Sequence, residues 1–462
     1  MIKILEQSEN ISHEYCCTVV KLGEIVPIEG SDFLGTAMVE GRTIVVRKDE
    51  VKEGNVMIYA SNESQLNKGF LSINNQFEDK ELNVDKEKKG YFNKYGRIRM
   101  IKLRGQVSMG YLFDKNALVT YCPKCASLDL DSMVGEDFDT VDGELFVKAY
   151  VPPVKEVRHS GTGNKRNKKL KKFNRMIEGQ FAFHYDTQQL QRNMERIKPN
   201  DIVTITNKLH GTSFILGNVL VKKPKFGGLY AKMFNYLPAW LQFTVPDYDI
   251  VYSSRTVIKN ANINPNVGPG YYDSDIWGEY FEKIKNFIPK GMTIYGEIVG
   301  YMTGSQRMVQ KGYDYGCMEG ENKLMIYRIT TMDESGEKHE WDVQSVQYWT
   351  ANLMLTHQEI AKYLHPIDIL YHGTLKDLYP GIDTECHWHE NVLEALKNDT
   401  EHFGMEKNEP MCKNKVPREG IVLRIDSDPI AEAFKLKCIK FLSKEAEMVD
   451  KGEIDVETEE RY

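Results

Sequence analysis

The 462-residue sequence contains no uninterrupted apolar run that approaches a membrane span, which needs about 18 residues. Hydrophobic residues nevertheless make up 41% of the chain, which is ordinary for a globular protein. Its first residues, MIKILE, lack the apolar core and the small-residue cleavage site of a signal peptide. We therefore expect a cytoplasmic protein with no membrane partner.

Cysteine is also scarce, since the chain has only 8. Without a secretion signal, this number favours reduced thiols over a disulfide framework. Cys122 and Cys125 form the sole Cys-x-x-Cys motif, and no second paired motif supplies the other two ligands of a closed zinc site. The segment from Cys386 to His389 contains further ligand types, but a surface loop explains it equally well.

An excess of positive charge is missing as well, because the formal net charge is −7. This balance excludes a generally cationic nucleic-acid coat. It leaves local basic patches as the means of holding any polyanion.

The length favours two domains and a connecting segment, since a typical domain has about 100 to 200 residues. Short apolar or alternating runs at residues 17–28, 43–47 and 56–59 predict a small N-terminal β-barrel. After Pro153 the composition changes to a basic run, residues 165–175, that contains no acidic residue. We predict domains at residues 1–155 and 181–462, joined by a basic linker at 156–180.

Three arginines in the N-terminal part suggest a phosphate-tracking face. Arg97, Arg99 and Arg104 lie in a segment that we expect to be extended, where alternate side chains share one face. A solvated charged strand face is the alternative interpretation.

Lys208 follows the alternating run at residues 201–205, so it should lie at the end of a strand. A partly desolvated lysine can act as a nitrogen nucleophile toward a phosphoryl centre. Gly211, three residues later, would let the backbone approach a ligand closely. On this pattern alone, an ordinary strand-end lysine before a turn glycine is the favoured interpretation, because Lys-x-x-Gly is short and common.

Further short strings follow Lys208 in a fixed order. They are Ser253-Ser254-Arg255, Tyr295-Gly296-Glu297-Ile298-Val299-Gly300, Leu324-Met325-Ile326-Tyr327-Arg328, Arg418-Glu419-Gly420-Ile421-Val422-Leu423-Arg424 and Phe434-Lys435-Leu436-Lys437. This ordered set resembles the motifs of the covalent lysyl-nucleotidyltransferase superfamily, which contains DNA ligases, RNA ligases and capping enzymes. His210, where DNA ligases and capping enzymes usually carry aspartate, makes the resemblance strongest to ATP-dependent RNA ligases that seal 3′-OH and 5′-phosphate ends.

The resemblance implies an α+β fold class. An oligonucleotide-binding (OB)-like β-barrel would precede a ligase-type nucleotidyltransferase domain of antiparallel sheets with flanking helices. It implies ATP and Mg²⁺ or Mn²⁺ as cofactors, lysyl-AMP and RNA-adenylate intermediates, a role in RNA repair, and nicked duplex RNA as a substrate for a monomeric enzyme. The alternatives are a capping-type guanylyltransferase, a DNA ligase, or an inactive homologue that only binds nucleic acid.

The resemblance also implies a role for each motif residue. Lys208 would be the nucleophile and His210 a catalytic residue of open role. Lys435 and Lys437, two residues apart on one strand, would share a face and reach the α-phosphate. The predicted nucleotide-binding residues are Asn207, Gly211, Arg255, Glu297, Tyr327 and Glu419, of which Glu297 and Glu419 would also bind the metal. Asn207 departs from the family, whose members often have glutamate there, and this weakens the case for ATP over GTP.

Three further segments carry secondary-structure predictions. Residues 183–193 are expected to form a helix capped by Asp186 or Thr187. Residues 222–243 mix lysines with aromatics, which suits phosphate contact and base stacking, although an amphipathic helix packed on the sheet is favoured. Periodic runs at residues 346–355 and 391–396 predict helices that flank the catalytic sheet.

Overall fold

The computed structural model describes residues 4–9, 11–152, 175–183, 187–260, 275–333, 336–426 and 433–450. The basic linker run, except for Arg175, and the residues after Asp450 lie outside these residues. The chain forms two compact units. The first comprises residues 1–153 and 445–450, and the second comprises residues 154–444 and 451–462.

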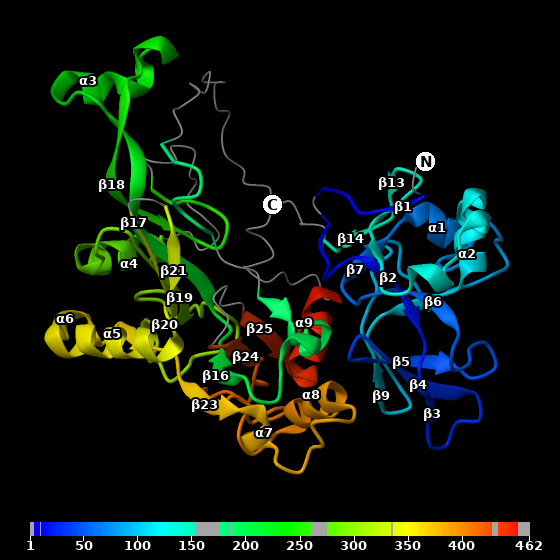
Figure 1. The fold of residues 1–462 in the computed structure, drawn as a ribbon. Coiled ribbons are helices and arrows are strands. Elements are labelled where there is room, and N and C mark those ends of the chain that lie inside the picture. The colour runs from blue at the N-terminus through cyan, green and yellow to red at the C-terminus, as the bar shows by residue number, and fades with distance from the viewer. Residues whose placement is uncertain are drawn as a thin grey trace. The chain divides into compact units, whose positions relative to one another are not determined.

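The described part of the first unit is built from short antiparallel strands (Figure 1). One sheet has the order β10-β6-β2-β11 and another the order β3-β4-β5, with smaller pairings β1-β12-β13, β14-β7 and β8-β9. The strands are β1 (Leu5–Glu6), β2 (Cys17–Lys21), β3 (Ile25–Pro27), β4 (Leu34–Val39), β5 (Arg42–Arg47), β6 (Val56–Ala60), β7 (Ser64–Leu66), β8 (Ile101–Leu103), β9 (Gln106–Ser108), β10 (Tyr111–Phe113), β11 (Asp137–Phe138), β12 (Thr140–Val141), β13 (Glu144–Leu145) and β14 (Val147–Ala149). The predicted runs of short strands are confirmed.

The hairpin of β4 and β5 shows how the sequence forms these strands. Buried and exposed residues alternate along both strands, as expected when one face packs on a core. Val39 pairs with Arg42, so the turn consists of Glu40 and Gly41 alone. Both have positive φ, 47° and 68°, which is the backbone that a two-residue turn needs to match the strand twist.

Helices α1 (Lys68–Ile73) and α2 (Lys115–Tyr121) pack on the strands of the first unit. Each begins at a side chain that accepts a backbone N–H, Asn67 for α1 and Asp114 for α2. Phe70 of α1 is fully buried and packs against Phe113 and Phe146, with ring centroids 4.9 and 5.0 Å away. This aromatic cluster supplies the main core of the unit.

The second unit contains two larger sheets, which are mainly antiparallel (Figure 1). The motif sheet has the order β15-β25-β24-β16-β23, and the long sheet has the order β18-β17-β19-β20-β21, with β22 beside β20. The strands are β15 (Gln188–Gln189), β16 (Ile202–Lys208), β17 (Thr212–Pro224), β18 (Thr244–Ser253), β19 (Met292–Gly300), β20 (Asn322–Met332), β21 (Lys338–Glu340), β22 (Leu364–Pro366), β23 (Ile369–Thr374), β24 (Gly420–Ile425) and β25 (Ala433–Lys437).

Seven helices are present in the described part of the second unit or continue from it. They are α3 (Gly228–Met233), α4 (Ile276–Ile284), α5 (Val343–Thr356), α6 (Gln358–Ala361), α7 (Leu375–Leu378), α8 (Trp388–Asn398) and α9 (Ile439–Asp450). Helices α5 and α8 contain the periodic runs at residues 346–355 and 391–396, so these helix predictions are confirmed.

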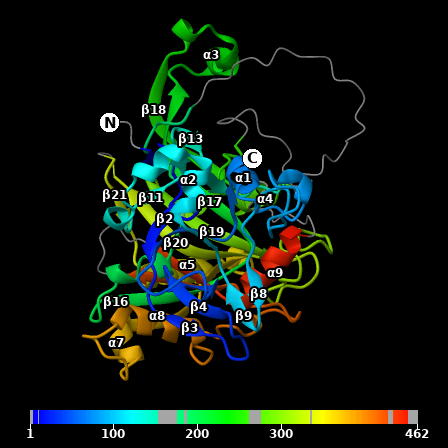
Figure 2. The ribbon, with the colours of Figure 1, turned by 90° about the vertical axis from the view of Figure 1, so that its right-hand side faces the viewer.

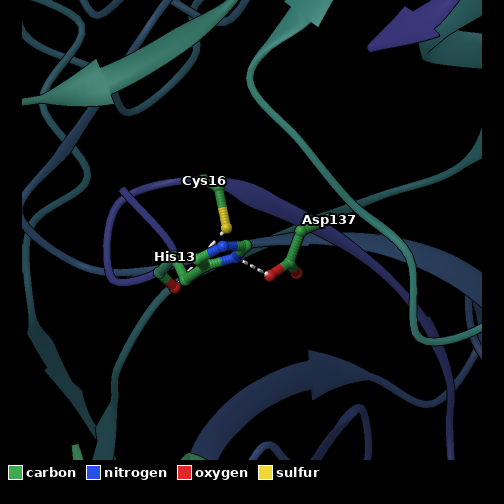
Figure 3. Close-up of side chains that lie close together, drawn as sticks. All are labelled: His13, Cys16 and Asp137. Atoms are coloured by element: carbon green, nitrogen blue, oxygen red, sulfur yellow. Dashed lines mark hydrogen bonds and ion pairs between the residues drawn. The ribbon is translucent and has the colours of Figure 1, made fainter. Parts of the chain in front are cut away.

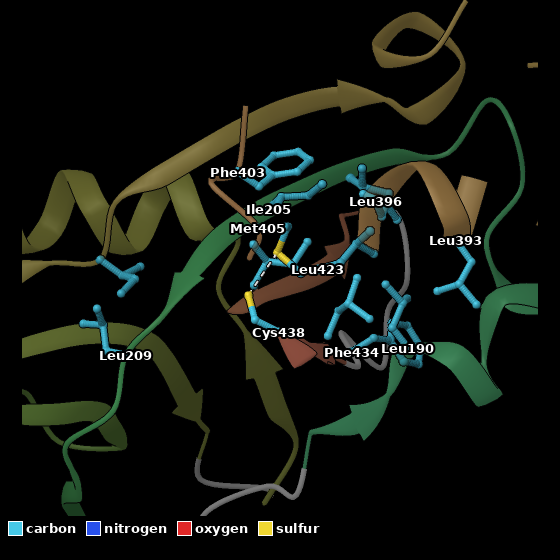
Figure 4. Close-up of a cluster of buried hydrophobic side chains, with 14 of the residues drawn as sticks. Leu190, Ile205, Leu209, Leu393, Leu396, Phe403, Met405, Leu423, Phe434 and Cys438 are labelled. Carbon is cyan, nitrogen blue, oxygen red and sulfur yellow. Dashed lines mark hydrogen bonds between the residues drawn. The ribbon is translucent and has the colours of Figure 1, made fainter. Parts of the chain in front are cut away.

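Each sheet has its own apolar core. In the motif sheet, Ile205, Leu423 and Phe434 pack with Leu393 and Leu396 of α8 (Figure 4). These side chains are essentially removed from solvent. A second core joins the long sheet to α4 and α5. Both sheets are therefore rigid supports for residues at their strand ends.

Strands β17 and β18 extend beyond the body of the long sheet. Only residues 212–217 of β17 pair with β19, whereas the pairing with β18 continues to Pro224 and Thr244. The outer part is thus a two-stranded ribbon that ends in α3, and Figures 1 and 2 both show α3 away from the rest of the long sheet. We call residues 222–245 the arm. The expected amphipathic helix packed on the sheet is wrong here, because the lysines at 222 and 223 continue β17 and α3 has only six residues.

The helix expected at residues 183–193 is also not observed. Residues 184–186, including the expected cap Asp186, lie outside the described part. Gln188 and Gln189 instead pair with Phe434 and Lys435 of β25, and Leu190 then enters the core. This segment lacks a full helical stripe of apolar residues, so hydrogen bonding to a sheet edge outweighs its weak helical pattern.

Candidate active site

The candidate site begins where the chain leaves one sheet and enters the other. Lys208 is the last residue of β16 and Thr212 is the first of β17, as the sequence predicted for a lysine at a strand end. The N–H of Gly211 donates to Glu297 Oε1 at 3.0 Å, and its carbonyl accepts from Gln310 Nε2 at 2.8 Å. The short crossing between the sheets is therefore fixed by two buried hydrogen bonds.

Gly211 is required by close packing. A Cβ at this position would lie 2.3 Å from the carbonyl oxygen of Ile298 and 2.9 Å from Glu297 Cγ. Backbone cannot move aside as a flexible side chain can, so any other residue would displace the loop. The proximity also brings Glu297, on β19, to the loop that carries Lys208.

Glu419 forms the centre of the charge cluster. Gly420 pairs with Lys208 on β16 and with Lys437 on β25, so the three strands place Glu419 beside both lysines. Its Oε1 lies 2.7 Å from Lys208 Nζ and 3.6 Å from Lys437 Nζ. His210 Nδ1 lies 3.9 Å from the other oxygen, Oε2. Four predicted residues, which come from three separate stretches of the sequence, are therefore brought together.

The Glu419 carboxyl is only 3% exposed. Burial by itself favours its neutral form, but the nearby charges of Lys208, Lys437 and His210 outweigh burial and lower its pKa below the usual value. Oε2 accepts no hydrogen bond from any residue in the described ranges. A buried anionic oxygen with this unused capacity is suited to a cation or a donor on a ligand.

Aromatic rings fix the position of His210. Its ring meets those of Tyr313 and Phe441 edge to face, with centroids 4.9 and 5.0 Å away. Its backbone N–H donates to the Tyr315 hydroxyl at 2.7 Å. Sequence reasoning missed these three aromatics, because none lies in a recognised string.

Asn207 occupies a different environment from the one expected. It is buried, and its Oδ1 accepts from Arg418 Nε at 3.0 Å. Arg418 Nε also lies 3.5 Å from the buried carboxylate of Glu409. The Asn207 carbonyl is thus engaged by Arg418, a residue of the Glu419 string to which sequence reasoning gave no role.

The remaining predicted residues lie on neighbouring elements. Lys435 and Lys437 are alternate residues of β25 and therefore share a face. The β19–β20 pairing shifts between Tyr295 and Gly296, which leaves Tyr327 as an extra residue at a bulge. A bulge re-aims the side chain that it carries. Arg255 follows β18 in a turn closed by a hydrogen bond from Ser254 N–H to the Val257 carbonyl.

Two groups of three side chains among the described residues could hold a metal ion, and neither contains Glu297 or Glu419. A divalent ion at this site would therefore need oxygens from a nucleotide or water in addition to these carboxylates. Mg²⁺ is commonly bound in this way, with one or two carboxylates and phosphate oxygens. The free capacity of Glu419 Oε2 fits such an ion.

The three arginines predicted to bind RNA belong to the first unit and do not form one face. Arg97 is 1% exposed, and its guanidinium donates to both oxygens of Glu63 at 2.8 Å, so the prediction that it binds RNA is wrong. Arg104 has a φ of 49° and lies in the turn between β8 and β9 rather than on extended backbone. Arg99 is partly exposed and pairs with Glu78 at 3.0 Å.

The cysteine pair also has a structural explanation. Cys122 and Cys125 are both buried in the core of the first unit. Neither belongs to a group of three possible metal ligands in the described part of the chain. No helix in that part is long and apolar enough to cross a membrane.

Comparison with known proteins adds the fold class. A family model described as an OB-fold domain matches residues 16–115. No curated protein matches the sequence. Among solved structures, the chain shares the fold of an RNA ligase, so the prediction of an OB-fold domain followed by a ligase-type domain with antiparallel sheets is confirmed.

The similar structures are those of the Naegleria gruberi RNA ligase. A mutant of it with AMP and Mn has a TM-score of 0.53 and 17% identity, covering 93% of this chain and 98% of that one. A mutant with ATP and Mn has a TM-score of 0.52 and 18% identity, with the same coverage. The structure with PPi has a TM-score of 0.51 and 16% identity, again over 93% and 98% of the two chains.

Proposed function

We propose that this protein is an ATP-dependent RNA ligase that seals 3′-OH and 5′-phosphate ends through lysyl-AMP and RNA-adenylate intermediates. The observation that carries the proposal is the contact of Glu419 with both Lys208 and Lys437 at the junction of two sheets. That cluster occurs in a fold shared with an RNA ligase whose structures include ATP, AMP and PPi. We also propose RNA repair, with nicked duplex RNA as the substrate.

In the first step, the Lys208 amine attacks the α-phosphate of ATP. A bond forms between Nζ and the α-phosphorus. The bond between the α-phosphorus and the oxygen that bridges to the β-phosphate breaks, and pyrophosphate leaves with that electron pair. An ammonium group cannot attack phosphorus, so the amine must first lose a proton. Water takes this proton, because the lowered pKa of Glu419 makes it a weak base; the carboxylate, 2.7 Å from Nζ, instead orients the Lys208 side chain.

Positive charge must then stabilise the transferring phosphoryl group. Lys435 and Lys437, on one face of β25, are proposed to contact the α-phosphate. Tyr327 at the β20 bulge would stack on the adenine, and Arg255 would hold the ribose or the RNA phosphate. The AMP passes to the RNA 5′-phosphate, and the 3′-hydroxyl displaces it to form the phosphodiester bond.

We propose that Glu419 and Glu297 hold Mg²⁺ or Mn²⁺ together with phosphate oxygens. A bound divalent ion would neutralise phosphate charge and compete with the Lys208 ammonium for the Glu419 carboxylate. Other residues of the site have positioning roles that do not depend on the ion. The Gly211 N–H donates to Glu297 and so fixes the loop after Lys208, and the Tyr313 and Phe441 rings pack against His210.

Incubation with labelled ATP, and separately with labelled GTP, tests the proposal. Denaturing electrophoresis should show a covalent adduct with ATP that is absent in Lys208→Ala. An adduct with GTP alone would indicate a capping-type enzyme, and no adduct would indicate an inactive nucleic-acid-binding homologue. Addition of nicked RNA and nicked DNA duplexes to the same reactions separates an RNA ligase from a DNA ligase.

A further inference from the structure

Three side chains with different metal-ligand atoms converge in the first unit, far in sequence from the motif residues (Figure 3). His13 and Cys16 lie in the segment before β2, and Asp137 begins β11. One ligand atom from each residue lies within 4.8 Å of those from the other two. Because β11 pairs with β2, with Asp137 opposite Thr18, the sheet fixes the carboxylate beside the preceding segment.

Hydrogen bonds already orient this group. Asp137 Oδ1 accepts from Thr18 Oγ1 at 2.6 Å, which directs the other oxygen, Oδ2, to His13 Nδ1 at 2.7 Å. The Cys16 thiol contacts the His13 carbonyl, with a sulfur–oxygen distance of 3.5 Å, so the two residues form one turn. A hydrogen bond to the remote oxygen of a carboxylate is the kind of support that orients metal ligands.

We propose that His13, Cys16 and Asp137 bind Zn²⁺. Imidazole nitrogen, thiolate sulfur and carboxylate oxygen are the three ligand types of zinc sites, and water would complete the tetrahedron. The His13 side chain is 63% exposed and that of Asp137 is 12% exposed, so the ion can enter from solvent while the sulfur lies beneath. On binding, the Cys16 thiol gives up its proton, and the neutral His13 ring carries its proton on Nε2 so that Nδ1 can bind the ion. The ion would join the segment before β2 to β11.

Cobalt provides a direct test, because a thiolate bound to Co²⁺ gives a charge-transfer absorption. The full-length protein should take up one Co²⁺ per chain with this absorption, and Zn²⁺ should displace it. Cys16→Ser should lose the absorption. His13→Ala changes an exposed side chain and removes a ligand. Loss of a ligand's hydrogen-bond partner alone lowers metal affinity about 10–100-fold, so His13→Ala should lower the Zn²⁺ affinity by more than this.

Cys386→Ser is the matched control, since Cys386 is an exposed cysteine followed by His387 and should not affect the absorption. Retention of the full absorption in Cys16→Ser, or its loss in Cys386→Ser, would overturn the proposal. Equal Zn²⁺ affinity of the wild type and His13→Ala would do the same.

A second inference comes from the arm of the second unit. Large apolar side chains are exposed along it, including Phe226, Tyr236, Trp240 and Phe243. Trp240 is 74% exposed and Tyr236 is 70% exposed. The arm nevertheless has an ordered interior, because Phe234 is fully buried and the Tyr230 hydroxyl donates to the Leu241 carbonyl at 2.6 Å. A small internal core therefore presents the other aromatic rings outward.

The charge of the arm indicates which class of ligand would bind to these exposed rings. Residues 222–243 contain four lysines and no acidic residue, in a chain whose net charge is −7. Cationic groups among exposed aromatic rings suit phosphates and unpaired bases, since every base can stack on a ring. Resting on the proposed function, we infer that the arm binds a single-stranded segment of the RNA substrate.

Tryptophan fluorescence tests this inference on the full-length protein. Single-stranded RNA should quench a component of the emission that is absent in Trp240→Phe. The double variant Trp240→Ser/Tyr236→Ser should bind this RNA at least about tenfold more weakly, because stacking contributes about 1–3 kcal/mol per base. Tyr348→Ser is the control, since Tyr348 is 77% exposed on α5, outside the arm.

Formation of the lysyl-AMP adduct by the same variants keeps the two proposals separate. The double variant should form the adduct at the wild-type rate, because the arm has no part in the attack on ATP. Absence of an adduct in the wild type would contradict the proposed function while leaving the RNA-binding test intact. Unchanged RNA affinity in the double variant, or Trp240 quenching by anionic vesicles but not by RNA, would overturn the inference.

Discussion

At the scale of single residues, Glu419 determines the electrostatics of the candidate site. It is a buried carboxylate whose pKa is lowered because the charges of Lys208, Lys437 and His210 outweigh the cost of burial. One of its oxygens contacts Lys208 and the other accepts no hydrogen bond within the described ranges. The same residue can therefore serve the nucleophile on one side and an incoming cation on the other.

The lowered pKa of Glu419 predicts a pH dependence of stability. An ionised carboxyl favoured in the folded state stabilises the protein fully above its unfolded pKa, about 4.3. That contribution is lost as the pH falls through the lower folded pKa. The difference in melting temperature between the wild type and Glu419→Gln should therefore be largest near neutral pH and shrink in acid.

Glu282→Gln is the control for this measurement, because the Glu282 side chain is 65% exposed and forms a surface ion pair with Lys285. Its melting temperature should follow that of the wild type throughout. A difference between wild type and Glu419→Gln that stays constant from pH 7 to pH 3 would show that Glu419 is not held in its charged form.

At the scale of elements, the site depends on the short crossing from β16 to β17. Gly211→Ala should place a methyl group against the Ile298 carbonyl and displace the loop of Lys208. Overpacking of this kind costs about 1–3 kcal/mol. A displacement of about 1 Å at a reacting group can slow a reaction on the order of a hundredfold. We expect lysyl-AMP formation to slow accordingly.

Gly227→Ala is the matched control, because a Cβ there would meet no atom within 4 Å and its φ of −84° suits alanine. Its rate of adduct formation should equal that of the wild type. A wild-type rate in Gly211→Ala as well would mean that the close approach to β19 does not position Lys208.

Elements with strong periodicity could be predicted from the sequence. The alternating run before Lys208 predicted the strand that ends at this residue, β16, and the apolar spacing at residues 391–396 predicted the helix α8. Gln188 and Gln189 could not be placed in the same way. Their strand depends on pairing with β25, more than 240 residues later, and no local pattern reports such a partner.

The same limit applies to side chains. Alternation predicts that two arginines share a face, but it does not reveal that Glu63 lies opposite Arg97 and buries it. Nor does it reveal that Arg418 holds Asn207, from which it is separated by 211 residues. The ordered strings predicted Lys208, His210, Glu419 and Lys437 as site residues because their chemistry is recognisable. The structural contacts that position them had no comparable signal.

At the scale of the whole molecule, the motif residues all belong to the second unit, and the OB-fold match lies in the first. We predict that removal of residues 1–155 preserves lysyl-AMP formation and depresses the sealing of nicked RNA. Sealing must also hold a 3′-hydroxyl strand, for which partly exposed Arg99 and the turn residue Arg104 are candidates. The loss should grow with salt concentration, as phosphate contacts weaken.

Circular dichroism must first show that the truncated protein is folded. If this folded protein joins pre-adenylylated RNA as fast as the full chain, the first unit has a role other than holding RNA.

The central claim is that Lys208 becomes covalently bound to AMP, and intact-protein mass spectrometry after incubation with ATP and Mg²⁺ tests it most directly. The wild type should gain the mass of one AMP group, and peptide mapping should locate it on Lys208. Lys208→Ala and Lys208→Arg should gain none, since alanine lacks the amine and a guanidinium stays protonated. An AMP adduct on either variant, or on another residue of the wild type, would contradict the account.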